Sequence, residues 1–300
     1  MPPVPSPNVV IYTENTVATN DSKTALINWA LSLPDSNKMK QQWLSDATNA
    51  VIAADVAAAG FDTVIVGLFH VNGDGTINYN DFPLESDLWE LLCEGITALK
   101  TSPGSTVKTL LFSFGGDGTS DTDYAFMKDY WTYFKPLMLK LVEKTGGDGV
   151  DWDYEPQMTF DTEFIIRITN EIAGEGYLVT AAPFTDMSSW ETVIEGTVKA
   201  GGSGNNFAWW NLQLYSLITD YRTWAPALQN DKTGMSPSGI EKFLIPGYAP
   251  PACNYQPAID DIKGLRQTFP NLGGAFIWNY SGIANCAPQV ASAIKGVFNP

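Results

Sequence analysis

Eight short apolar runs recur along the chain, and each is separated from the next by enough residues for a helix. Runs of Val, Ile, Leu and Phe bounded by Gly, Asn and Pro are typical of strands buried on both faces. Eight such strands alternating with helices predict the α/β class and a single (β/α)8 TIM barrel. The expected strands are Asn8–Tyr12, Thr63–Phe69, Thr106–Ser113, Gly149–Tyr154, Tyr177–Ala182, Trp209–Tyr215, Lys242–Pro246 and Ala275–Trp278.

Helical patterns lie between these runs. They cover Met39–Ala59, Leu88–Lys100, Tyr124–Lys144, Asp161–Ala173 and Ile259–Phe269. A doubly wound open sheet is the alternative fold, but no glycine-rich phosphate fingerprint follows the first strand. Residues Thr13–Met39 form a long first connection, which we expect at the rim of the barrel. We therefore expect one catalytic barrel domain over residues 1–300, with a Pro-rich lead-in over residues 1–7.

The charge balance of the chain restricts its partners. Seventeen Lys and Arg oppose 33 Asp and Glu, which gives a formal net charge of −16. Such a surface repels phosphate backbones and anionic lipids, so we expect neither nucleic acid nor membrane as a partner. The first seven residues lack the charged and apolar regions of a signal peptide. We expect a monomer that is secreted and begins near its mature N-terminus, with a cytoplasmic location as the alternative.

Histidine and cysteine are scarce, which removes several kinds of catalytic site. The one histidine, His70, rules out metal sites that need two imidazoles and any Ser–His triad built elsewhere. Cys93, Cys253 and Cys286 are too few for a disulfide scaffold and too scattered for a metal site. Either Cys253 pairs with Cys286, or all three thiols stay free. We expect no metal and no cofactor, so carboxylates, hydroxyls and aromatic surfaces must carry the chemistry.

The fourth expected strand is unusually acidic. It belongs to the segment GDGVDWDYEP, residues Gly147–Pro156. Because a strand has a period of two, Asp151, Asp153 and Glu155 point to one face, which in a barrel is the interior near the C-terminal mouth. Three carboxyl groups on one buried line are costly unless they share protons or meet a cationic transition state. A calcium loop or a solvated acidic turn is the alternative, but such loops carry Gly and Asn where this segment has Trp and Tyr.

The segment Asp148–Glu155 resembles the D-G-x-D-x-D-x-E signature of family 18 glycoside hydrolases, which comprise chitinases and endo-β-N-acetylglucosaminidases. Ser113–Gly116 (SFGG), at the end of the expected third strand, is similar to the S-x-G-G element of that family. The resemblance implies a TIM barrel. The stretch between Pro246 and Ala275 is too short for the α+β module that some chitinases insert before their last strand.

The resemblance also implies a substrate-assisted, retaining mechanism, in which no enzyme carboxylate attacks the sugar. Glu155 is then the general acid that protonates the glycosidic oxygen, and it later takes a proton from water. The 2-acetamido oxygen of the substrate attacks C1. Asp153 holds the acetamide N–H and stabilises the positive charge, while Asp151 shares a proton or hydrogen bond with Asp153. Tyr215 matches the family tyrosine whose hydroxyl meets the acetamide carbonyl.

Further residues are expected to contact the sugar. Trp278 resembles the tryptophan that ends the last strand of the family and lies under the cleaved sugar, where an indole face covers pyranose C–H groups. The other expected contacts are Tyr12, Ser113, Gly116, Asn211 and Gln213. An internal polar network of the barrel is the alternative for Gln213 and Tyr215, and a core position is the alternative for Trp278.

The substrate that we expect is a β-1,4-linked N-acetylglucosamine (GlcNAc) oligosaccharide or polysaccharide, cleaved in the manner of a chitinase. The alternative is an endo-β-N-acetylglucosaminidase that cleaves the diacetylchitobiose core of N-glycans. A lectin-like protein that binds chitin is a third hypothesis. It is disfavoured because such members of the family lack the acid, whereas Glu155 is present here. The catalytic residues serve both enzymes equally, so the sequence leaves the choice to the loops after the strands.

Overall fold

A computed structural model of the chain describes residues 4–84, 87–202, 204–216 and 218–299. Its central sheet closes on itself: parallel strands follow the order β1, β12, β11, β10, β9, β8, β7, β4, and β4 pairs again with β1. The eight barrel strands are β1 (Asn8–Thr13), β4 (Thr63–Val71), β7 (Thr109–Gly115), β8 (Gly149–Asp153), β9 (Leu178–Ala181), β10 (Trp209–Leu212), β11 (Leu244–Tyr248) and β12 (Gly274–Ile277). The predicted (β/α)8 barrel is confirmed. Residues 1–3 of the Pro-rich lead-in lie outside the described residues.

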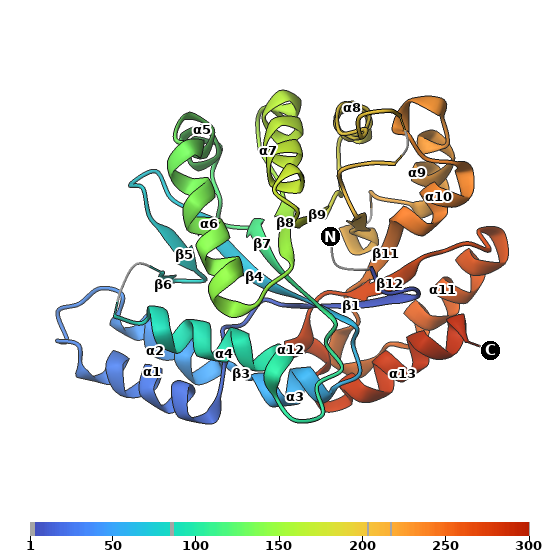
Figure 1. Cartoon of the computed structure of the whole chain (residues 1–300). Helices are drawn as coiled ribbons and strands as arrows, with labels where there is room; N and C mark the ends of the chain where they lie inside the picture. Colours follow the sequence, from blue (N-terminus) through green and yellow to red (C-terminus); the bar gives the residue numbers. More distant parts are fainter. Residues whose placement is uncertain (1–3, 85–86, 203, 217, 300) are drawn as a thin grey trace.

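Helices surround this barrel, and α1, α2 and α4 pack together on one side of it (Figure 1). The α-helices are α1 (Asn20–Ser32), α2 (Lys40–Asn49), α3 (Ala53–Ala58), α4 (Trp89–Thr101), α5 (Asp121–Asp129), α6 (Trp131–Thr145), α7 (Thr162–Gly174), α8 (Met187–Gly196), α9 (Tyr221–Leu228), α10 (Pro237–Phe243), α11 (Gln256–Thr268), α12 (Tyr280–Ile283) and α13 (Ala287–Phe298). Short elements fill the connections: β2 (Val17–Ala18), β3 (Val51–Ile52), β5 (Ile77–Tyr79), β6 (Phe82–Pro83), η1 (Leu214–Ser216), η2 (Asp231–Thr233), η3 (Pro251–Cys253) and η4 (Ala284–Cys286). Among the described residues, no helix has the length and apolar character needed to cross a membrane.

Several expected strand boundaries differ from the structure by one or two residues, and two differ by three. The third strand begins at Thr109 instead of Thr106, because Thr106 donates its backbone N–H to Ala57 in α3 and not to a strand neighbour. The sixth strand ends at Leu212 instead of Tyr215, and Leu214–Ser216 form the 3-10 turn η1. The alternation expected along this strand therefore stops before Gln213, although Gln213 remains buried.

Several helices differ from the periodicity of the sequence. The expected helix Met39–Ala59 is split, because β3 pairs with β2 and separates α2 from α3. The expected helix Tyr124–Lys144 is also split, since Tyr130 leaves the helical conformation between α5 and α6. The connection Thr13–Met39, expected as a rim loop, contains the 13-residue helix α1, which begins at a capping box on Thr19.

The residues of β8 divide cleanly between the barrel interior and the helix layer. Asp151 and Asp153 point inward, whereas Trp152 points outward, where its indole lies edge-on to Trp131 of α6. The indole Nε1 of Trp152 donates a hydrogen bond of 3.1 Å to Oγ1 of Thr169 on α7, and both groups are buried. This contact fixes the acidic strand against two helices.

We expect Thr169→Val to destabilise the protein by about 1–3 kcal/mol, because the isosteric valine leaves the buried Trp152 N–H without a partner. Urea unfolding measures this difference in the free energy of unfolding. Thr192→Val on the exposed side of α8 is the control, and its effect should stay within about 0.5 kcal/mol. Equal effects of the two substitutions would contradict the bracing role of Thr169.

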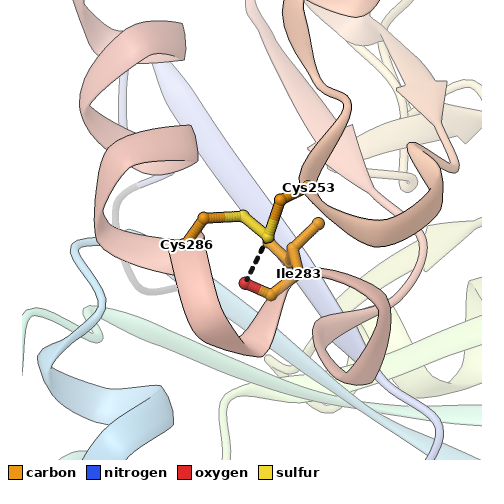
Figure 2. Close-up of a disulfide and its surroundings, with 3 residues drawn as sticks. All are labelled: Cys253, Ile283 and Cys286. Carbon is orange, nitrogen blue, oxygen red and sulfur yellow. Dashed lines mark hydrogen bonds between the residues drawn. A yellow bond between two sulfur atoms is a disulfide. The ribbon is translucent and has the colours of Figure 1, made fainter.

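A disulfide decides the cysteine pairing that the sequence left open. Cys253 in η3 is bonded to Cys286 in η4, and Sγ of Cys253 lies 3.9 Å from the carbonyl oxygen of Ile283 (Figure 2). Cys93 on α4 is buried and free. The disulfide joins the connections that follow β11 and β12. Because the connection of residues 249–273 contains only η3 and α11, it holds no α+β module, as expected.

Candidate active site

The three carboxyl groups of the acidic segment are exposed to different degrees along the barrel axis. Asp151 is 0% exposed and Asp153 is 5% exposed, whereas Glu155 lies beyond the end of β8 and is partly exposed. Asp151 lies deepest in the barrel, Asp153 lies above it, and Glu155 lies at the mouth. A substrate that enters the mouth therefore meets Glu155 first and Asp153 next, and Asp151 lies behind both.

Asp151 is held by four side chains from four other strands. Tyr12 and Ser113 each donate a 3.0 Å hydrogen bond to Oδ2, and Thr180 and Asn211 donate to Oδ1 at 2.5 and 3.2 Å. Burial raises the pKa of Asp151, and these four hydrogen bonds oppose the shift. Tyr12, Ser113 and Asn211 thus converge on a carboxylate. Their expected contact with a sugar stays a prediction.

Asp153 and Glu155 are bridged by one side-chain amide. The amide Nε2 of Gln213 donates to Asp153 at 3.1 Å and to Glu155 at 3.0 Å, and it also reaches the carbonyl oxygen of Ala182 at 2.8 Å. The pKa of Asp153 is raised well above its usual value by burial, by the charges of Glu155 and Asp151, and by a hydrogen bond with Glu155. Asp153 therefore keeps its proton at pH values where an isolated carboxyl group is ionised.

Two consecutive glycines let the S-x-G-G loop approach this pair. Gly115 and Gly116 have φ values of +112° and +77°, in the left-handed region that favours glycine. The backbone N–H of Gly116 donates to the carbonyl oxygen of Asp153 at 2.7 Å. A Cβ atom on Gly116 would lie 2.8 Å from Oδ2 of Asp153. Gly116, which we predicted as a sugar contact, therefore leaves room for the Asp153 carboxylate.

Tyr124 of α5 is a site residue that the sequence analysis missed. Its hydroxyl donates to the carbonyl oxygen of Asp153 and accepts from the backbone N–H of Glu155, both at 3.2 Å. Burial raises its pKa, so the phenol stays protonated. Tyr124 therefore fixes the backbone turn that carries Glu155 out of the strand. In the sequence it is one more aromatic residue at helical spacing, which does not distinguish it from a core residue.

An aromatic wall lies across the mouth from the carboxyl groups. The rings of Tyr215 and Trp278 are stacked, with centroids 6.5 Å apart and an interplanar angle of 23°, and Tyr12 lies 5.4 Å from Trp278. Burial and the charges of Asp153, Glu155 and Asp151 raise the pKa of Tyr215. Among the described residues, the Tyr215 hydroxyl has no hydrogen-bond partner, so it is free to donate to a ligand. The structure thus brings Tyr215 and Trp278 together on the side of the mouth that faces the carboxyl groups.

Asp153 should make the stability of the folded protein depend on pH. Its raised pKa means that the folded state binds the proton more tightly than the unfolded state, whose value is near 3.8. The resulting stability is complete below that value and is lost as the pH rises through the folded pKa. Asn cannot ionise, so we expect Asp153→Asn to raise Tm at neutral pH and to flatten the decline of Tm as the pH rises above about 4. Thermal unfolding of both proteins tests this; parallel curves would contradict it.

The described residues contain no group of three or more His, Cys, Asp or Glu side chains placed to hold a metal ion. The site offers a partly exposed carboxyl group at Glu155, a buried carboxyl group behind it at Asp153, a free phenol at Tyr215 and a partly buried indole at Trp278. This set can protonate a leaving oxygen and stabilise a developing positive charge.

Comparison with solved structures places this site in a known fold. A GH18 chitinase from Pseudoalteromonas aurantia matches with a TM-score of 0.62 and 17% identity, over 97% of this chain and 99% of that one. A fungal family 18 endo-β-N-acetylglucosaminidase matches with a TM-score of 0.61 and 17% identity, over 96% and 98% of the two chains. The Group IV chitinase of Ostrinia furnacalis, in complex with allosamidin, has a TM-score of 0.64 at 12% identity, over 97% and 98%.

No protein-family model matches the chain, and no curated protein sequence matches it. The fold that the acidic signature implied is nevertheless confirmed, because the chain shares the family 18 barrel over nearly its whole length.

Proposed function

We propose that the protein is a retaining glycoside hydrolase that cleaves β-1,4 linkages between GlcNAc residues within a chain, as a chitinase does. The observation that carries the proposal is the pair of carboxyl groups of Asp153 and Glu155, which Gln213 bridges at the mouth opposite Tyr215 and Trp278. The shared fold with chitinases, one of them bound to allosamidin, supports the same substrate class.

In this mechanism Glu155 donates its proton to the glycosidic oxygen as the bond to C1 breaks. The acetamide oxygen of the substrate forms a bond to C1 from the opposite face, and the positive charge spreads onto the acetamide nitrogen. Asp153 accepts the acetamide N–H and stabilises that charge, and the Tyr215 hydroxyl orients the acetamide oxygen. Glu155 then removes a proton from water, which attacks C1 and breaks the bond between C1 and the acetamide oxygen, so that the configuration at C1 is retained.

The surroundings of the pair suit this sequence of steps. Burial and the neighbouring carboxyl groups raise the pKa of Asp153 well above its usual value, so a proton is held beside Glu155 at pH values where an isolated aspartate has lost it. Asp151 supplies a further negative charge behind Asp153, which favours the cationic intermediate over the neutral ground state. Trp278 offers an apolar face for the sugar that carries the reacting C1.

An endo-β-N-acetylglucosaminidase is the second candidate. The absence of the α+β module between β11 and β12 favours it, since the mouth lacks one wall that would confine a linear polymer. Its substrate, the diacetylchitobiose core of an N-glycan, presents the same acetamido sugar to Asp153 and Glu155. The fungal enzyme of this type with the same fold adds support.

One experiment separates these functions. The protein is incubated with chitotetraose or longer GlcNAc oligomers and, separately, with a high-mannose glycoprotein. We expect cleavage of the oligomers and no electrophoretic shift of the glycoprotein. A clean deglycosylation shift with intact oligomers would replace the chitinase proposal with the endo-β-N-acetylglucosaminidase. Binding of the oligomers without cleavage of either substrate would favour a lectin-like protein and overturn both.

A further inference from the structure

Two adjoining hollows lie outside the barrel mouth, between α5, α6 and α7. The first, of about 360 Å³, is lined by Tyr154 and Pro156 after β8 and by the facing side of α5. The second, of about 380 Å³, continues beyond it and is lined by Trp131, Thr132, Lys135, Arg167 and Glu171. Both include Lys128 and Asp129, so they form one strip, which we call the α5–α7 strip. The strip begins at Pro156, directly after the general acid.

The floor of the strip is apolar. Tyr154 and Phe164 line the first hollow, and the buried Trp131 lines the second. Met158, which stands at the edge of the first hollow, is 84% exposed and is the most exposed large hydrophobic side chain of the described residues. Apolar floors with polar edges bind pyranose rings, because the C–H face is buried while the hydroxyls stay at the edge.

The charges along the strip are largely neutralised by one another. Lys128 pairs with Asp161 at 2.5 Å, and Lys135 pairs with Glu175 at 2.6 Å. Within the described part of the chain, the Asp129 carboxylate has neither an ion pair nor a hydrogen bond, and the same holds for the hydroxyls of Thr132 and Thr159. The strip therefore offers free acceptors and donors on a face without strong positive charge. On a protein with a net charge of −16, that combination suits a neutral polyhydroxyl chain and not an anionic one.

We propose that the α5–α7 strip binds the leaving-group arm of a neutral GlcNAc polymer. This inference rests on the proposed function. Glu155 protonates the glycosidic oxygen, which stays with the leaving sugar. The leaving sugar therefore lies next to Glu155, and the sugars that follow it pass over Pro156 into the strip. Each hollow exceeds the ~300 Å³ at which small-ligand sites begin.

A sugar site in the α5–α7 strip would favour a linear GlcNAc polymer over an N-glycan as the substrate. A linear polymer has further sugars beyond the leaving unit, and these can occupy both hollows. The leaving part of an N-glycan is a single GlcNAc on asparagine, followed by polypeptide, which gains nothing from a sugar site. The proposal therefore predicts that hydrolysis becomes more efficient as the leaving-group arm grows longer.

Blocking the first hollow tests the proposal. Ala125 on α5 lines it and is exposed, so Ala125→Arg fills the hollow without disturbing the core. Thr122→Arg, an exposed position on the same helix outside both hollows, is the matched control. The substrates are the GlcNAc hexamer and 4-nitrophenyl chitobioside, whose leaving group contains no sugar. We expect Ala125→Arg to lower kcat/KM on the hexamer by roughly three- to tenfold and to leave the chitobioside unchanged.

Equal kcat/KM values of Ala125→Arg and Thr122→Arg on the hexamer would overturn the proposal, and so would an equal loss on both substrates. Thr132→Arg blocks the second hollow and replaces Ala125→Arg if that variant does not fold. If the wild-type protein cleaves neither substrate, the proposed function fails. Calorimetric titration with the hexamer then tests the strip by itself, where weaker binding to Ala125→Arg than to Thr122→Arg supports it and equal binding overturns it.

Discussion

Replacing Glu155 with glutamine should lower kcat on GlcNAc oligomers by about two to four decades. Glutamine has nearly the same shape and still reaches Gln213, but it carries no proton that it can donate to the glycosidic oxygen. KM should change little, because the amide keeps the size of the carboxyl group at the mouth. Steady-state kinetics on the GlcNAc hexamer measure both quantities.

Glu163→Gln, on the exposed first turn of α7, is the control for this variant and should retain wild-type activity. Activity of Glu155→Gln within a few-fold of wild type would remove Glu155 from the role of acid. Oligomer binding should survive the substitution, and its loss would instead indicate that Glu155 shapes the binding site.

The second large effect is expected at Asp153. Asparagine cannot stabilise the positive charge that develops on the acetamide, and it removes the carboxyl group that lies beside Glu155. We expect Asp153→Asn to lower kcat by about 10²- to 10³-fold, while the binding of the oligomer weakens much less. We expect kcat to fall more than binding because the positive charge on the acetamide exists in the transition state and not in the bound substrate.

Asp260→Asn, at an exposed position on α11, serves as the control and should leave kcat unchanged. The Asp153→Asn variant also tests the expected effect of Asp153 on the stability of the folded protein. The same variant is expected to raise Tm at neutral pH, so a loss of activity cannot be ascribed to unfolding. A fall in kcat accompanied by a fall in Tm would contradict both expectations together.

The sequence was sufficient for the barrel and for the acidic strand. Buried parallel strands are continuous apolar runs, and a period of two then assigns Asp151 and Asp153 to the interior without any tertiary information. The end of the sixth strand was not predictable in the same way. Residues up to Tyr215 continue its apolar and aromatic composition, whereas the turn of η1 is set by tertiary contacts of Gln213 with Ala182 and the acidic pair.

The hydrogen-bond partners of the site residues were harder to predict from the sequence. Ser113 and Asn211 were expected at the sugar, and the structure shows that each of them donates a hydrogen bond to the carboxyl group of Asp151. Tyr124 acts on the backbone of Glu155 from a neighbouring βα unit, a relation between residues 31 positions apart that no local pattern encodes. The same limit applied to Cys253 and Cys286, which the folding of two separate connections brings together.

The configuration of the first product tests the central claim most directly. Proton NMR recorded during the early hydrolysis of a GlcNAc oligomer distinguishes the α and β anomers of the new reducing end before mutarotation mixes them. Substrate-assisted hydrolysis by Glu155 and Asp153 predicts that the β anomer appears first, since two displacements at C1 retain the configuration. Initial formation of the α anomer would show a single displacement by water and would contradict the mechanism, even on the same barrel.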